Sequence, residues 1–123
     1  MKYNGYRDLK VFRLSYTLAM DIFEITKSFP QEERYALVDQ VRRSSRSVPA
    51  NIAEAWKKRR YPKMFTSKLI DSAGEAGETE VWLDVCRDSG YLDTERYTKL
   101  IAGYDEVNRM LYGMVGKPEK FCT

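Results

Sequence analysis

The sequence predicts an all-α protein, an up-down four-helix bundle, and two observations lead to this prediction. Apolar residues recur every three or four positions, and no segment alternates with the period of two typical of a strand. Helix-breaking residues cluster at only four places: Phe29-Pro30, Tyr61-Pro62, Ser89-Gly90 and Gly116-Lys117-Pro118. A chain of 123 residues suffices for one core. We therefore expect a single domain over residues 1–123, with helices at about 8–28, 32–60, 62–89 and 93–116.

The first predicted helix is apolar on two faces, which is more than an isolated bundle needs. One face carries Leu9, Phe12, Tyr16, Ala19, Met20 and Phe23, and another carries Val11, Leu14, Leu18, Ile22, Ile25 and Phe29. A bundle helix normally buries one apolar stripe against its own core. The second face is therefore expected to be covered by another copy of the chain, in a homo-oligomer.

The second predicted helix combines an apolar stripe, which includes Leu37, Val41 and Ile52, with a central Pro49. Proline inside a helix removes a backbone donor and clashes with the preceding turn. Because the apolar spacing stays in phase across Pro49, the pattern favours one kinked helix over a new helix capped by Ser47.

The third predicted helix contains Gly74 and Gly77, and the fourth begins after Asp93, a residue that caps helices well. Glycine inside a helix costs about 1 kcal/mol relative to alanine. We expect the two glycines to allow tight packing against a neighbouring backbone.

Charge is unevenly distributed along the chain, although 21 basic and 18 acidic residues give a net charge of only +3. Residues 42–70 have a net charge of +8, and residues 71–84 have a net charge of −5. The two blocks either neutralise each other on neighbouring helices or form an electropositive surface for a polyanion.

The segment 37–54, LVDQVRRSSRSVPANIAE, resembles the signature of the 23S rRNA intervening-sequence proteins, four-helix bundles first noticed in insertions of bacterial ribosomal RNA genes. DLKV at 8–11, EAGETEVWLD at 75–84 and GYL at 90–92 agree with the resemblance, although Ala55 stands where many members have glycine. The resemblance implies an up-down bundle that assembles as a ring-like homopentamer. Its relatives include the accessory protein of diversity-generating retroelements, which engages nucleic acid and a reverse transcriptase. No biochemical activity is established for the family at large.

The absence of histidine from the sequence excludes most catalytic centres. It removes Ser-His-Asp and Cys-His nucleophiles, His-ligated metals and ribonuclease centres of the HEPN type. Glu54, Glu75, Glu78 and Glu80 lack the histidine partners of carboxylate di-metal bundles, and Cys86 and Cys122 are too few for a zinc site. We therefore expect no enzyme, no metal and no cofactor, in a cytoplasmic protein without a membrane segment.

The basic residues of the second helix and the following turn are the candidate nucleic-acid contacts, because cations neutralise phosphates without reading sequence. Trp56 and Tyr61 flank this run and could stack on unpaired bases, although core packing is the alternative for Trp56. The predicted contacts are Arg42, Arg43, Arg46, Lys57, Lys58, Arg59, Arg60 and Lys63.

A second group of polar residues, Gln40, Pro49, Asn51 and Glu54, is predicted to form a structural network around the kink, with a ligand-binding carboxylate as the alternative. Together these features predict a non-catalytic homo-oligomer that binds RNA or other nucleic acid. The alternative function is a scaffold that binds an acidic or polymerase-type protein partner.

Overall fold

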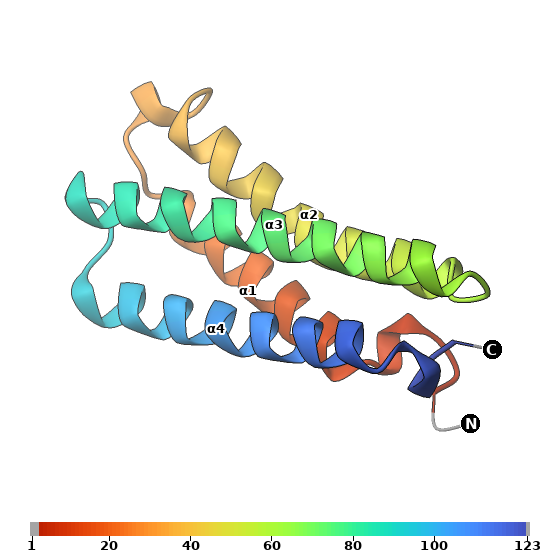
Figure 1. Ribbon diagram of the computed structural model, residues 1–123. Coiled ribbons are helices and arrows are strands. Elements are labelled where there is room, and N and C mark those ends of the chain that lie inside the picture. Colours follow the sequence, from red (N-terminus) through yellow and green to blue (C-terminus); the bar gives the residue numbers. More distant parts are fainter. Residues whose placement is uncertain (1–2, 123) are drawn as a thin grey trace.

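A computed structural model, which describes residues 3–122, has four long helices in one up-down bundle (Figure 1). The helices are α1 (Lys10–Thr26), α2 (Leu37–Lys57), α3 (Pro62–Asp88) and α4 (Thr94–Gly116). Three short 3-10 helices, η1 (Tyr6–Asp8), η2 (Gln31–Glu33) and η3 (Pro118–Lys120), lie in the connections and near the C-terminus. The all-α class and the up-down arrangement are confirmed. The ends of the predicted domain, 1–2 and 123, lie outside the described part of the chain.

Each helix packs against the next one along the chain, and α1 also packs against α4, so the bundle closes. Phe65 and Leu69 of α3 and Tyr104 and Leu111 of α4 are completely buried in the core. Because the chain crosses the bundle four times, both described ends of the chain lie beside the α2–α3 turn (Figure 1).

Two of the predicted helix starts differ from the structure by more than one residue: the start of α1 by two residues and the start of α2 by five. α1 begins at Lys10 because residues 6–8 form the 3-10 helix η1, and α2 begins at Leu37 instead of 32. Ala36 has non-helical backbone angles (φ −120°, ψ −102°), and Tyr35 is 83% exposed, so no apolar stripe supports a helix over 32–36. At the start of α4, the Asp93 side chain accepts a hydrogen bond from the Arg96 backbone N–H (2.8 Å), as the cap prediction requires.

α2 runs without interruption through Pro49, so the chain has one helix there and not two. The Ser47 hydroxyl donates to the Arg43 carbonyl (3.0 Å) inside the helix instead of capping a new one. The kink expected at Pro49 stays a prediction.

The prediction of tight packing at Gly74 and Gly77 is wrong for the bundle itself. A Cβ atom added at either glycine would have no other atom within 4 Å apart from its own chain neighbours and helix backbone. The close helix approach occurs at Gly103 of α4, where a Cβ would lie 2.6 Å from Cδ2 of Leu18 on α1.

Candidate nucleic-acid interface

Four predicted cations gather at the turn between α2 and α3: Lys57, Lys58, Arg60 and Lys63. The turn is tight because the Lys58 N–H bonds to carbonyls of the last turn of α2, and the Tyr61 N–H bonds to the Lys58 carbonyl (2.9 Å). Pro62 then starts α3 at the position where a proline costs nothing. Among residues 3–122, none of the four cations has a carboxylate partner at ion-pair distance. Their positive charges are thus available to an external anion.

Arg59, in the middle of the same run, is used inside the fold. Its guanidinium stacks on the Trp56 ring, 4.1 Å from the ring centre, and its Nη1 donates to the Trp56 carbonyl (3.0 Å). Trp56 is buried and meets Tyr3 edge-on, so it packs in the core as the alternative interpretation proposed. Tyr61, with 57% of its surface exposed, is the aromatic side chain left for stacking.

The three arginines of the first half of α2, which the sequence assigns to one contact surface, turn in different directions in the fold. Arg42 turns to α1, where its Nε donates to Thr26 Oγ1 (2.8 Å) and its Nη2 donates to the Phe23 carbonyl (3.3 Å). Arg43 turns to α3 and pairs with two glutamates, while Arg46 lies over the Phe23 ring and beside a groove described below.

The acidic block on α3 neutralises part of the basic block, as one of the two sequence interpretations expected. Arg43 pairs with Glu75 (3.3 Å) and with Glu78. Hydrogen bonds from the Trp82 indole and from Arg43 hold the pKa of Glu78 below its usual value. Lys68 pairs with Glu54 (3.5 Å) and Asp71 (3.7 Å). Neutralisation therefore occurs along the middle of the α2–α3 pair and leaves the turn at its end positive.

Further bases reach the same end of the bundle from the chain termini, and the sequence reasoning missed them. Lys10, Lys117 and Lys120 surround a groove of about 260 Å³ between the start of α1 and the end of the chain. Phe121 stacks on Tyr3 (5.9 Å between ring centres) and on Phe65 (6.1 Å), which fixes the C-terminal segment there. Residues 3–13, 54–68 and 110–122 together contain eleven basic and three acidic residues. The bundle thus has one strongly basic end.

The predicted structural network does not form as one unit. Gln40 is exposed, and Glu54 is exposed and pairs with Lys68. Asn51 donates to the Ser47 carbonyl (2.9 Å), one turn earlier in α2. Three of the four residues are polar, but in the described part of the chain Asn51 and Glu54 bond to other partners and no hydrogen bond joins any two of the four.

The buried polar network that does exist joins α2 to α3 through hydroxyl groups. Thr79 donates to Ser44 Oγ (2.8 Å), and Ser72 donates to the Val48 carbonyl (2.8 Å), just before Pro49. All three hydroxyl side chains are completely buried. Hydroxyl residues at the apolar positions of the helical pattern are the sequence signal for this network.

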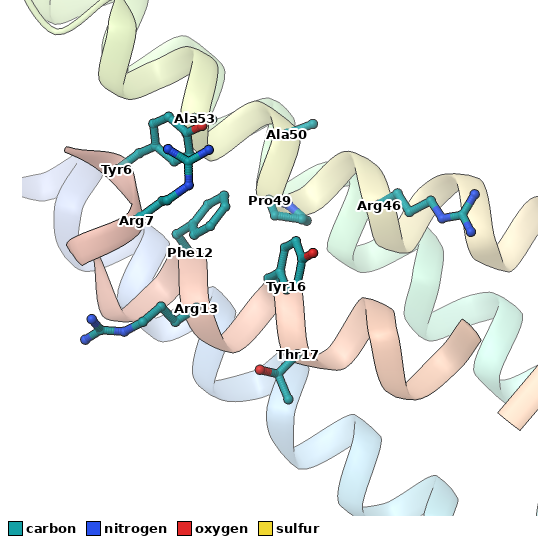
Figure 2. A pocket seen from close by; sticks show the side chains of 10 residues that line it. All are labelled: Tyr6, Arg7, Phe12, Arg13, Tyr16, Thr17, Arg46, Pro49, Ala50 and Ala53. Atoms are coloured by element: carbon teal, nitrogen blue, oxygen red, sulfur yellow. The ribbon is translucent and has the colours of Figure 1, made fainter. Parts of the chain in front are cut away.

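A second surface feature is an open groove between α1 and α2, with a volume of about 770 Å³ (Figure 2). Phe12 and Tyr16 of α1 form one side, and Pro49, Ala50 and Ala53 of α2 form the other. Tyr16 is 53% exposed and Met20 is 45% exposed, so the bundle leaves part of one of the two apolar faces of α1 uncovered. Arg7, Arg13 and Arg46 surround this groove and make its rim basic.

No group of histidine, cysteine, aspartate or glutamate side chains in the described residues could hold a metal ion. Within the same residues, no helix combines the length and apolar character that a membrane crossing needs.

The up-down arrangement of α1 to α4 makes this chain a four-helix-bundle protein. Within that class, the chain belongs to the 23S rRNA-intervening sequence protein family, whose model matches residues 7–113. A solved structure from Bacteroides thetaiotaomicron, described as a protein of unknown function from the S23 ribosomal protein family, superimposes with a TM-score of 0.77. It is 28% identical, and the match covers 85% of this chain and 97% of the other. No protein with a curated description matches this chain.

Proposed function

We propose that this protein is a non-catalytic, homo-oligomeric nucleic-acid-binding module that contacts RNA or other nucleic acid through the basic end of its bundle. The observation that carries the proposal is a group of four cations at the α2–α3 turn, Lys57, Lys58, Arg60 and Lys63, which have no carboxylate partner among residues 3–122. Lysines from both ends of the chain extend this surface. Tyr61 adds an exposed ring on which an unpaired base can stack.

Homo-oligomerisation is part of the proposal because an oligomer presents several copies of the basic end, which is a small surface in a single copy. The uncovered apolar face of α1 supports it, and the resemblance to the family implies a ring-like homopentamer. Several basic ends on one assembly would bind one long nucleic acid together, with an avidity far above the affinity of a single copy.

An electrophoretic shift with structured RNA across a salt series tests the proposal. If each copy neutralises about five phosphates of a duplex, log K falls against log salt with a slope of roughly −4 to −5. Binding that does not change with salt would contradict the proposal.

Charge reversal separates local contact from net charge. Changing Lys57, Lys58, Arg60 and Lys63 to glutamate is expected to abolish the shift. The matched control reverses four bases away from the basic end, Lys27, Arg34, Arg96 and Lys99, which changes the net charge by the same amount. Equal loss of binding in both variants would show that net charge, and not this surface, holds the nucleic acid.

The alternative function is a scaffold for an acidic or polymerase-type protein partner, supported by the basic rim of the α1–α2 groove. Stoichiometric recovery of one protein after nuclease treatment would favour this function. Loss of that partner on reversal of Arg7, Arg13 and Arg46, with RNA binding absent in the unaltered protein, would establish it.

A further inference from the structure

The outer face of α3 is apolar, exposed and interrupted by two glycines. Ile70 is 49% exposed, Val81 is 54% exposed and Val85 is 38% exposed. Gly74 and Gly77 lie between them at helical spacing, so the five residues form one stripe, which we call the α3 stripe. α3 packs on α2 and α4 with its other sides, and these bury Phe65 and Leu69. The bundle therefore leaves the apolar side chains of the α3 stripe uncovered, although α3 carries charged residues on either side of them.

The two glycines of the α3 stripe have no function inside the bundle. Each costs a helix about 1 kcal/mol relative to alanine. Among residues 3–122, apart from the chain neighbours and the nearby backbone of α3, no atom lies within 4 Å of a Cβ placed at either position. The close approach that would account for them must therefore come from outside the chain.

The α1–α2 groove has the complementary shape. Its rings, Phe12 and Tyr16, project from α1 toward α2, where Tyr16 lies beside Pro49, and they line an open groove of about 770 Å³ (Figure 2). A helix whose surface is flattened by glycines can approach aromatic rings more closely than one that carries larger side chains.

The charges around the two surfaces are also complementary. Arg7, Arg13 and Arg46 surround the groove. Asp71 and Asp88 border the α3 stripe with exposed side chains, and each pairs with a base of its own helix, Lys68 or Arg87. Residues 70–88, which carry the stripe, nevertheless have a net charge of −5. Opposite charges around an apolar contact fix its register and suppress incorrect partners.

We propose that the α3 stripe of one copy docks in the α1–α2 groove of the next copy. α1 and α3 occupy diagonal positions in the bundle and do not pack together, so one copy can use both surfaces at once. The contact is therefore head-to-tail, and repetition continues until the assembly closes on itself. This inference rests on the homo-oligomer of the proposed function and assigns the two faces that form it.

A wedge in the α3 stripe tests the contact. Gly77→Leu places a large side chain at a half-buried helix position where a Cβ would meet nothing within 4 Å in the described residues, so the monomer is expected to keep its fold and its helical circular dichroism. The matched control is Gly113→Leu, at an exposed α4 position that also has nothing within 4 Å. Light scattering should give a multiple of 14.4 kDa for the unaltered protein and the control, and a mass close to 14.4 kDa for Gly77→Leu. A monomeric unaltered protein, or an unchanged mass for Gly77→Leu, would overturn the proposal.

Cross-linking shows directly which faces meet. In a Cys122→Ser background, Tyr16→Cys is combined with either Gly74→Cys or Gly77→Cys, and a short bismaleimide is added. A head-to-tail contact gives a ladder of covalent oligomers beyond the dimer in at least one double variant and no ladder in any single variant. A covalent dimer of Tyr16→Cys alone would show that two α1 faces meet and would refute the assignment. RNA binding is measured separately on the unaltered protein. If that protein gives no RNA shift but the double variant still gives a ladder, the proposed nucleic-acid function is refuted and the interface is not.

Discussion

Gly103 is the position where α4 and α1 come closest, and alanine at this position should destabilise the fold. The new Cβ would lie 2.6 Å from Cδ2, 3.0 Å from Cδ1 and 3.3 Å from Cγ of Leu18. Carbon atoms prefer a separation of about 3.5–4.0 Å, so the buried Leu18 side chain has to move by about 1 Å. Such overpacking typically costs about 1–3 kcal/mol.

Alanine also improves helix propensity by about 1 kcal/mol, and Gly113→Ala provides the correction for this gain. Gly113 belongs to the same helix, but a Cβ there would meet nothing within 4 Å. We expect Gly113→Ala to raise the free energy of unfolding by up to about 1 kcal/mol. The free energy of unfolding of Gly103→Ala should be about 1–3 kcal/mol lower than that of Gly113→Ala.

Urea unfolding followed by circular dichroism, at one fixed protomer concentration, measures both values. An equal gain in the two variants would refute the reasoning. Leu18 would then have moved without cost into the neighbouring α1–α4 groove, which has a volume of about 600 Å³.

Three further predictions concern single side chains. Burial and neighbouring carboxylates raise the pKa of Glu80 in the folded state above its usual value. Ionisation of Glu80 therefore lowers the free energy of unfolding as pH rises from the unfolded-state pKa through the folded-state pKa. Glu80→Gln should raise the free energy of unfolding at pH 7 and leave it nearly unchanged at pH 3, which urea titrations at the two pH values will measure. Arg42→Ala should lower the free energy of unfolding by about 1–2 kcal/mol, because Thr26 Oγ1 and the Phe23 carbonyl of α1 lose their donor. In the same assay, Arg60→Ala should change the free energy of unfolding by less than about 0.5 kcal/mol. Burial raises the pKa of the Cys86 thiol to about 11, so a thiol reagent at pH 8 should modify only Cys122 quickly, and simultaneous modification of both thiols would contradict the packing.

The sequence was sufficient to predict the helices because their signals are local. Pro62 and Asp93 begin α3 and α4 at positions where the backbone chemistry of proline and aspartate favours a helix start. The two-faced character of α1 was also readable, since Tyr16 remains exposed while Ile22 is buried. The predicted start of α2 is five residues early, because residues 31–36 contain no glycine or proline to mark the separate 3-10 helix η2.

The candidate interface was only partly predictable, because sequence spacing cannot show which partner a long side chain reaches. Arg42, Arg43 and Arg59 belong to the basic run, yet one crosses to α1, one crosses to α3 and one stacks on Trp56. The contribution of Lys120 depends on where the chain end returns, which no local pattern encodes. The unoccupied space around Gly74 and Gly77 likewise requires the positions of neighbouring helices.

The even number of long helices has a practical consequence for work with this protein. Tyr3 and Phe121 are in contact, so anything fused to either terminus is attached beside the α2–α3 turn and its cations. A charged tag there would compete with an anionic ligand or screen it. The α3–α4 connection, where Gly90 adopts a positive φ of 81°, lies at the opposite end of the molecule (Figure 1). It is the preferable place for a fluorophore or a surface-attachment point, because a probe there leaves the basic end unobstructed.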